Sequence, residues 1–227
     1  MEIRKVFGGS KEDIKSGKYN IFIGISLGNK WFTKDNLRQY LRWALDNSKD
    51  MVLFLIADEI HAINYNVRSG QSKEKNLRKA LNVGMKMKGV VIELIEELSD
   101  EEQKKVNILN WKEYRDKDLF CEKYRFSAYD EFNSNPDFKK SILNIVKKAM
   151  TDRDFSDEDY LEFSRYLLEE FVSIYSGVSY SSVSYEAYPY PFEGELNYFI
   201  DDIQNCKIFS ELNKKLPEQK AIRVVLN

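Results

Sequence analysis

The stretch Tyr19-Asn-Ile-Phe-Ile-Gly-Ile-Ser-Leu-Gly-Asn-Lys-Trp-Phe-Thr33 joins an apolar run to a periodic, helix-like segment through one short turn. The run from Ile21 to Ile25 is rich in β-branched residues, which is typical of a buried strand. Gly28 breaks it, and apolar residues at helical spacing predict a helix over 34–45. Ser26 thus ends a buried strand, where open α/β sheets bind ligands. On this stretch alone, a serine that only caps or bends the turn is the favoured interpretation.

A second buried strand is predicted over 50–56, so that two strands and a helix form a parallel, right-handed unit. Further strands are predicted at 2–7, 106–109, 178–188 and 221–226, and helices at 71–98, 117–132, 136–150, 157–175 and 193–203. The long 71–98 helix is expected to be interrupted near Gly84 or Gly89, and Pro189 is expected to end the 178–188 strand. Because the chain has neither repeats nor a linker, residues 1–227 are predicted to form a single α/β domain with helices on both faces of the sheet.

Composition narrows the functional classes. Apolar residues make up 43% of the 227, but no run is long enough to span a membrane, and residues 1–5 lack the apolar core of a signal peptide. Cys121 and Cys206 lie far apart, which indicates a reduced, cytoplasmic protein. The net charge of −2 means that a nucleic acid would need a local basic patch. We expect a monomer.

One helix supplies such a patch. Its cations follow one another with no acid between Glu74 and Glu93, and they are Lys73, Lys75, Arg78, Lys79, Lys86 and Lys88. Helical spacing puts Lys75, Arg78, Lys79 and Lys86 on one side. Such a face is equally consistent with contact to a phosphate backbone and with simple solvation.

Two further groups of residues suggest chemistry. Tyr166 and Glu170 are four apart in a predicted helix, so they share a face and could hold a substrate ammonium group. Tyr185, Tyr188 and Tyr190 run to the end of a predicted strand, where their hydroxyl groups could relay protons. Spacing alone favours plainer roles, a surface carboxylate beside a half-buried tyrosine and aromatic packing at a sheet edge.

Gly24-Ile-Ser-Leu-Gly28 has the G-x-S-x-G spacing of a nucleophile elbow. A hydrolase triad would then need a late histidine, but the single histidine, His61, comes early in the chain. His61 follows Asp58 and Glu59 at a spacing that matches no metal site, so a structural role is favoured and no metal is predicted.

Taken together, these motifs resemble the cyclodipeptide synthases. The similarity is carried by Gly24 to Asn29, by the pairs Trp31-Phe32 and Trp43-Ala44, by Tyr166 with Glu170, by the basic stretch 73–88 and by the tyrosines of 185–190. It runs in order from about residue 19 to residue 200. The resemblance implies a Rossmann-like fold with a mostly parallel sheet, similar to the catalytic domain of class I tyrosyl- and tryptophanyl-tRNA synthetases.

The resemblance also implies a mechanism. Two aminoacyl-tRNAs would react by ping-pong catalysis through an aminoacyl-Ser26 enzyme to give a diketopiperazine, without a cofactor. Tyr166 and Glu170 would hold the ammonium group, Glu170 would accept a proton, and Tyr188 would relay protons. Tyr188-Pro189 fits one subfamily and Asn29 is more typical of another, so Tyr185 and Tyr190 stay candidates for the late tyrosine.

The remaining expected roles concern binding. Gly24, Asn29, Phe22 and Val52 are expected to bind the aminoacyl group, main-chain amides of residues 27–29 to stabilise the oxyanion, and Lys73, Lys75, Arg78, Lys79 and Lys86 to contact tRNA. The alternatives are a serine hydrolase that depends on His61 and a non-catalytic tRNA-binding module.

Overall fold

The computed structural model describes residues 1–117 and 119–227, and the side chains of all of these except 117 and 119–123. Its main sheet has the strand order β1-β8-β7-β2-β3-β4. The strands are β1 (Ile3–Phe7), β2 (Ile21–Ile25), β3 (Val52–Ile56), β4 (Val106–Asn110), β7 (Ala187–Tyr190) and β8 (Ile222–Leu226). Every neighbouring pair is parallel except β1 and β8, which are antiparallel. The predicted α/β architecture with a mostly parallel sheet is therefore confirmed.

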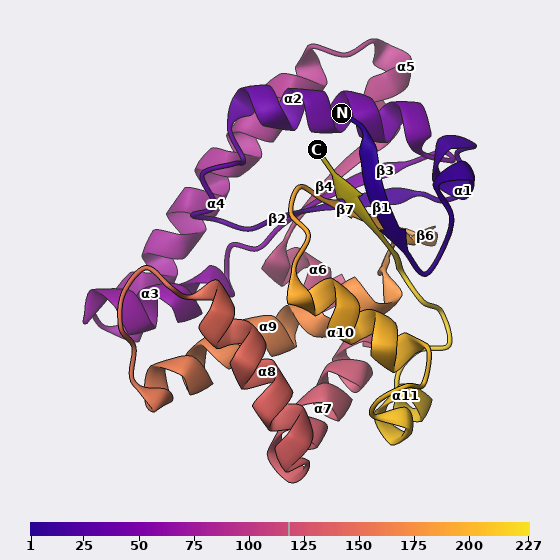
Figure 1. Ribbon diagram of the computed structural model, residues 1–227. Helices are drawn as coiled ribbons and strands as arrows, with labels where there is room; N and C mark the ends of the chain where they lie inside the picture. The colour runs from indigo at the N-terminus through magenta and orange to yellow at the C-terminus, as the bar shows by residue number, and fades with distance from the viewer. Residues whose placement is uncertain (118) are drawn as a thin grey trace.

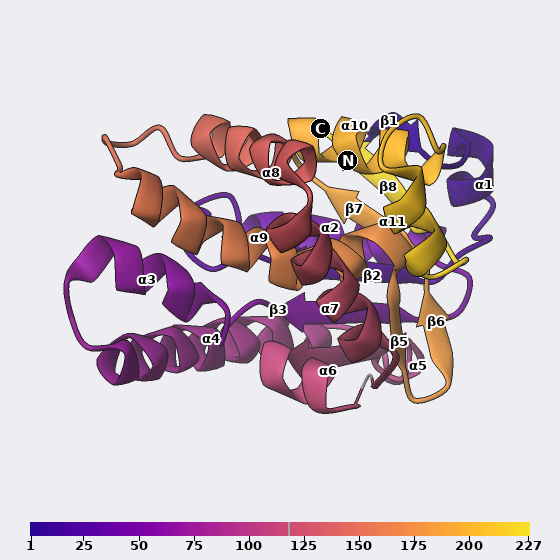
Figure 2. The same ribbon diagram turned by 90° about the horizontal axis from the view of Figure 1, so that it is seen from below.

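Helices cover both faces of this sheet (Figures 1 and 2). One face packs against α1 (Lys11–Lys15), α2 (Lys34–Asn47) and α4 (Lys73–Glu96). The other packs against α6 (Trp111–Lys117), α7 (Leu119–Ser134), α8 (Pro136–Ala149), α9 (Asp157–Ser176), α10 (Glu195–Gln204) and α11 (Ser210–Lys215). Two further helices, α3 (His61–Ser69) and α5 (Asp100–Gln103), flank α4 in the chain. The apolar alternation of β2 explains the two cores, because Phe22 enters one and Ile21 and Ile23 enter the other.

The strand order reverses between β2 and β7. From β2 the chain proceeds through β3 to β4 at one edge, whereas β7 and β8 lie on the other side of β2. Ligands of open α/β sheets bind at such a reversal, in the crevice outside the carboxyl ends of the strands. Ser26 follows β2 directly and Tyr190 ends β7, so both lie at this reversal.

The region predicted as one strand over 178–188 is instead three. β5 (Val178–Tyr180) and β6 (Val183–Tyr185) form a separate hairpin, and β7 then joins the main sheet. The turn uses Ser181 and Ser182 with positive φ angles of 50° and 65°, positions where glycine is the usual signal. Pro189 does not end a strand but lies inside β7, where its Cα is opposite Val224 of β8. It is tolerated because the recorded pairing between β7 and β2 is confined to Ala187 and Ile21.

The expected interruption of the long helix is also wrong. α4 continues through Gly84 and Gly89, at a cost of about 1 kcal/mol per helical glycine relative to alanine. Gly84 has a packing reason, since a Cβ atom built there would lie 2.3 Å from Asp58 Cβ. The helix predicted over 117–132 includes residue 118, which lies outside the described residues, and α7 begins at Leu119. The remaining predicted elements are present with shifts at their ends.

Candidate active site

Ser26 is held in a tight turn at the carboxyl end of β2. The backbone N–H of Asn29 donates to the Ser26 carbonyl at 3.3 Å. Gly28 adopts a φ of 86°, a left-handed conformation that favours glycine, and a Cβ atom there would lie 3.2 Å from His61 Cε1. Thr33 then caps α2 by accepting from the N–H of Asn36. The turn therefore presents the Ser26 side chain at the crevice.

A chain of hydrogen bonds joins Ser26 to the carboxyl group of Glu170. The Tyr166 hydroxyl lies 3.2 Å from Ser26 Oγ and donates to Glu170 Oε1 at 3.0 Å. Because Tyr166 has one hydroxyl proton and gives it to Glu170, the hydrogen between Ser26 and Tyr166 comes from Ser26. Tyr166 and Glu170 come from successive turns of α9. The structure thus brings together three residues that lie up to 144 positions apart, as Ser26 and Glu170 do (170 − 26).

Burial determines the pKa values of Tyr166 and Glu170 in this hydrogen-bonded series. Removal from solvent raises the pKa of Glu170 from 4.5 to about 7, although the hydrogen bond from Tyr166 acts in the opposite direction. Burial, and then the nearby charge of Glu170, raise the pKa of Tyr166 well above its ordinary value. Tyr166 therefore stays a neutral donor near pH 7, whereas Glu170 is poised between its two forms. A carboxyl group poised near neutral pH suits general acid–base work.

Tyr188 lies over the strand that carries Ser26. Its ring stacks on Phe22, with centroids 4.8 Å apart and planes 15° apart. A Cβ atom at Gly24 would lie 3.0 Å from Tyr188 Cε2 and 3.2 Å from its hydroxyl oxygen. Gly24 therefore makes room for Tyr188, and Phe22, only 1% exposed, lies beneath Tyr188 and supports it. No hydrogen bond to the Tyr188 hydroxyl is recorded within the described part of the chain.

The three candidate tyrosines separate in the structure. Tyr190 accepts a hydrogen bond from Asn29 Nδ2 at 3.3 Å, and its ring centroid lies 5.9 Å from that of Tyr188. Tyr185 is fully buried and accepts from Asn107 Nδ2 at 3.0 Å, toward the amino end of β4. Tyr188 and Tyr190 are thus near the crevice, and Tyr185 is not. Burial raises the pKa of Tyr188 well above its ordinary value and, to a lesser extent, that of Tyr190, so both remain protonated near neutral pH.

Asn29 fixes the turn from both sides. Its Oδ1 accepts from the Trp31 N–H at 3.0 Å while its Nδ2 reaches Tyr190. The N–H of Asn29 is already bonded to Ser26, so it is not available to an oxyanion. Over the described residues, the N–H groups of Leu27 and Gly28 have no recorded acceptor. These two amides follow Ser26 in the chain and are therefore candidate donors to an oxyanion.

Val52 does not reach the site. It begins β3 opposite Ile21, at the far end of the strand from Ser26, and points into the core beneath α2 and α4. A one-residue change in position moves a strand side chain to the other face of the sheet. The residue opposite Gly24, on the same face as Phe22, is Leu55. Because β3 is apolar throughout, the sequence does not show which of its side chains share a face with Phe22, and it does not predict Leu55.

The cations predicted to share one side of α4 line a shallow depression in the structure. Lys75, Arg78, Lys79 and Lys86 line one shallow depression of about 410 Å³, whereas Lys73 is exposed outside it. Arg78 pairs with Glu74 on the same helix, and Lys79 lies 4.2 Å from the Tyr65 ring centroid. Within the described chain, Lys75 and Lys86 have no recorded ion pair. Two cations therefore remain uncompensated in the depression.

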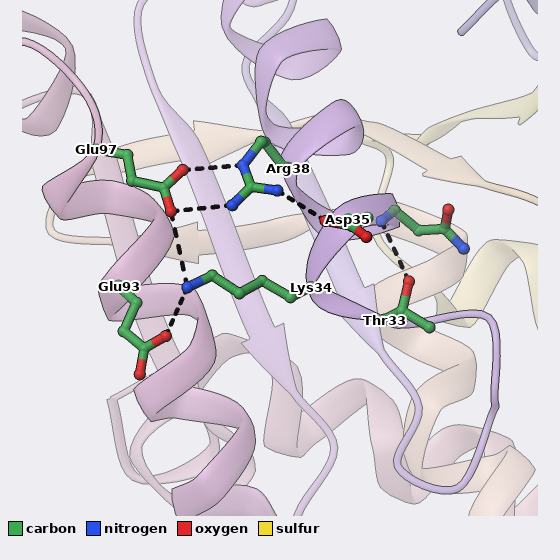
Figure 3. A network of polar contacts seen from close by, with 7 residues as sticks. Thr33, Lys34, Asp35, Arg38, Glu93 and Glu97 are labelled. Carbon is green, nitrogen blue, oxygen red and sulfur yellow. Dashed lines mark hydrogen bonds and ion pairs between the residues drawn. The ribbon is translucent and has the colours of Figure 1, made fainter.

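An ion-pair network holds the other half of α4 against α2, the helix that follows the Ser26 turn (Figure 3). Lys34 Nζ lies 2.7 Å from Glu93, and Arg38 contacts Glu97 through Nε at 2.9 Å and through a terminal nitrogen at 3.0 Å. All four side chains are substantially exposed, so each pair contributes little by itself. The two-point contact of Arg38 with Glu97 therefore contributes more to the relative orientation of α2 and α4 than to the stability of the fold.

His61 is not arranged as a catalytic base. Its Nδ1 lies 3.3 Å from Asn64 Nδ2, and its ring packs edge-on against Tyr65. Burial lowers the pKa of His61 to about 4, so it is neutral near pH 7. No hydrogen bond between His61 and Ser26 is recorded in the described chain.

The described residues contain no cluster of three metal-ligating side chains. Among the described helices, none combines the length and the apolar character that a membrane crossing requires.

A family model described as "Cyclodipeptide synthase" matches residues 6–171. A cyclodipeptide synthase from Bacillus thermoamylovorans superposes with a TM-score of 0.73 at 21% identity, covering 95% of this chain and 91% of the other. A Mycobacterium tuberculosis protein, described as relating such enzymes to type I tRNA synthetases, superposes with a TM-score of 0.68 at 18% identity, covering 93% and 86%.

A third similar structure contains an RNA. It is a cyclodipeptide synthase from Candidatus Glomeribacter gigasporarum bound to Phe-tRNAPhe, with a TM-score of 0.56 at 19% identity, covering 91% of this chain and 88% of the other. At these identities the likeness shows the shared fold. No curated protein sequence matches the chain.

Proposed function

The chain belongs to the cyclodipeptide synthase family, and from that premise we propose that it joins the aminoacyl groups of two aminoacyl-tRNAs into a cyclic dipeptide. The observation that carries this proposal is the hydrogen-bonded chain from Ser26 through Tyr166 to Glu170 at the strand-order reversal. Residues 1–227 act in this proposal as one catalytic domain and as a monomer. An aminoacyl ester is already activated, so the reaction needs no ATP, metal or other cofactor.

In the first half-reaction, Ser26 Oγ attacks the ester carbonyl carbon of one aminoacyl-tRNA. The bond from that carbon to the ribose oxygen breaks, and an aminoacyl-Ser26 ester forms. Tyr166 and Glu170 hold the ammonium group of the aminoacyl moiety. The same pair takes up the Ser26 proton, because the hydrogen bonds already run from Ser26 to Tyr166 to Glu170. The proton then passes to the departing ribose oxygen, so Glu170 returns to its ionised form.

The oxyanion formed during this attack needs donors. The N–H groups of Leu27 and Gly28 fit that role, since they follow Ser26 directly and the Asn29 N–H is occupied. In this proposal Leu55, which pairs with Gly24 and shares the face of β2 and β3 that carries Phe22, limits the size of the bound side chain.

In the second half-reaction, the amino group of another aminoacyl-tRNA attacks the acyl-Ser26 carbonyl. Glu170 accepts the proton that this amine loses, Ser26 Oγ–H is restored, and a dipeptidyl-tRNA results. Its free amino group then attacks its own ester carbonyl, which releases tRNA and closes the diketopiperazine ring. Tyr188 assists as a proton relay and positioning group; its hydroxyl is preferred to that of Tyr190 because Asn29 holds the latter.

The tRNA acceptor end is proposed to lie along the depression on α4. Among the described residues no ion pair to Lys75 or Lys86 is recorded, so both can pair with phosphates, and Arg78 and Lys79 line the same surface. Gly84 lets this helix approach Asp58, which follows β3 at the same edge of the sheet as Ser26. This packing joins α4 to the segment that follows β3, the strand next to β2.

Two other functions remain to be separated from this one. A serine hydrolase would require His61 as base, and its hydrogen bonding to Asn64 does not favour that role. A non-catalytic tRNA-binding module would bind tRNA equally well without Ser26 and form no product.

The proposal is tested by expressing wild type and Ser26→Ala in a bacterial host and analysing both cultures by mass spectrometry. Cyclic dipeptides that appear only with wild type support it. Cyclic dipeptide from Ser26→Ala would rule out the acyl-serine route. Ester hydrolysis that depends on His61, with no cyclic dipeptide, would indicate a hydrolase instead.

A further inference from the structure

An exposed aromatic side chain stands at the open edge of the active site. Phe192, two residues after β7, is 45% exposed, although phenylalanine is among the residue types most often buried. Its ring packs edge-on against Trp31 at 6.4 Å and against Tyr190 at 5.9 Å between centroids. We call Trp31, Tyr190 and Phe192 the aromatic rim.

The aromatic rim is tied directly to the turn that presents Ser26. Tyr190 is bonded to Asn29, whose own N–H donates to the Ser26 carbonyl. The backbone of Trp31 is fixed on both sides, since its N–H donates to Asn29 and its carbonyl accepts from Asn36 Nδ2 at 2.6 Å. The rim is therefore preorganised, and its open surface belongs to Phe192.

The proposed substrate limits what can lie at this position. The aminoacyl ester joins the ribose of the 3′-terminal adenosine, so attack by Ser26 places that nucleoside directly beside the turn. Two protein side chains already lie close to the strand and the turn, because Tyr188 lies against Gly24 and His61 lies against Gly28. Exposed aromatic surface is available at Phe192, whose ring contacts Trp31 of the turn.

A cation in the turn itself fits a nucleotide. Lys30 is exposed between Asn29 and Trp31, and within the described residues no ion pair to it is recorded. Exposed aromatic rings and cations together bind single-stranded nucleic acid, by base stacking and phosphate pairing, and Lys30 is the neighbour of Trp31 in the chain.

We propose that Phe192, supported by Trp31, stacks on the 3′-terminal adenine of the aminoacyl-tRNA that acylates Ser26, and that Lys30 pairs with a phosphate next to that nucleotide. This inference rests on the proposed function and assigns a base-binding position within it. Stacking places the ester carbonyl against Ser26 Oγ, so its loss slows acylation without altering the Ser26–Tyr166–Glu170 chain.

The test measures single-turnover acylation of Ser26 from two aminoacylated acceptor-stem minihelices. One ends in adenosine and the other in an abasic ribose, and each carries the amino acid that wild type transfers fastest. We expect Phe192→Ala to slow acylation from the adenosine-ended donor about 5- to 150-fold, the range for removal of one base–aromatic stack. Phe192→Trp restores the rate, and with the abasic donor the wild type and Phe192→Ala are equally slow.

The matched control is Phe126→Ala, which removes a ring that is 55% exposed on α7 and should change neither rate. Equal slowing of both donors by Phe192→Ala would show a merely structural role and overturn the inference, as would no slowing of either. If wild type acylates Ser26 from neither donor, the proposed function itself fails, which is a different result from either of these.

Discussion

The Tyr166 hydroxyl lies 3.2 Å from Ser26 Oγ and gives its own proton to Glu170. A single phenol therefore links the nucleophile to the carboxylate. Tyr166→Phe removes that link while keeping the ring that packs in the core. We expect acylation of Ser26 to fall by about 10²- to 10⁴-fold, the usual contribution of a positioned acid–base group. Rapid-quench measurement of the acyl-enzyme gives the rate.

A matched control for this change lies one helix away. Tyr129 also donates to a glutamate, Glu169, at 2.8 Å. Tyr129→Phe should therefore cost some stability but leave acylation within about twofold of wild type, since a surface-accessible hydrogen bond contributes about 1 kcal/mol to folding. Similar acylation by both variants would remove Tyr166 from the mechanism.

The pKa of Glu170 predicts a pH dependence. Burial raises this pKa to about 7, so Glu170 is protonated, and unable to accept a proton, at lower pH. Acylation should rise as pH increases from 5.5 to 7.5, with an apparent pKa of about 7, and should be slow and nearly pH-independent in Glu170→Gln. A rise that persists unchanged in Glu170→Gln would assign the titration to another group.

The same shift has a consequence for stability. The pKa of Glu170 is higher in the folded protein than the ordinary 4.5, so its effect favours folding below pH 4.5 and is lost as pH rises through about 7. The melting temperature of Glu170→Gln should therefore increase relative to wild type between pH 5 and pH 8. A constant difference across this range would contradict the buried environment assigned to Glu170.

Gly24 and Gly89 should respond oppositely to alanine. A Cβ atom at Gly24 meets the Tyr188 ring at 3.0 Å, whereas one at Gly89 of α4 meets nothing within 4 Å. Gly24→Ala should displace Tyr188 and reduce cyclic dipeptide formation at least tenfold. Gly89→Ala should preserve product formation and stabilise the protein by about 0.5–1 kcal/mol, because alanine favours a helix. Thermal unfolding and product assays of both variants check this pair, and normal product formation by Gly24→Ala would show that Tyr188 need not stay in place.

Charge reversal on α4 should change the salt dependence of tRNA binding. Lys75 and Lys86 line the depression without a recorded intramolecular partner among the described residues. Lys75→Glu and Lys86→Glu should each weaken binding and reduce the slope of log affinity against log salt by about 1 for each phosphate that the variant no longer neutralises. Lys104, exposed next to α5 beyond the other end of α4, is the control (Figure 1). Filter binding over a salt series would contradict the assignment if Lys104→Glu had the same effect.

Local patterns in the sequence predicted the elements that carry the site. The β-branched run before Ser26, the helical spacing of Tyr166 and Glu170, and the row of cations on α4 are all periodic signals. They identified the strand, the shared helix face and the basic surface. The sheet order could not be obtained in this way, because the pairing of β7 with β2 depends on contacts between distant segments.

The errors have equally local causes. A fully apolar strand gives no sign of its inward face in the sequence, so the prediction chooses Val52, whereas in the structure Leu55 shares the face of Phe22. The hairpin at Ser181 and Ser182 was missed because it uses positive φ angles without glycine. Whether Tyr185 or Tyr188 faces Ser26 depends on this hairpin, which carries Tyr185 away to Asn107.

Acylation of Ser26 is the step on which the proposed reaction depends, and mass spectrometry of the intact protein detects it. Wild type is mixed with a complete set of aminoacyl-tRNAs, quenched in acid within seconds and mapped by peptide digestion. We expect an added mass equal to one aminoacyl residue on the peptide that contains Ser26. This mass should be absent from Ser26→Ala and should be lost when a second aminoacyl-tRNA is supplied with time for turnover. Cyclic dipeptide formation by wild type with no adduct on Ser26 at any time, and undiminished formation by Ser26→Ala, would contradict the proposed acylation.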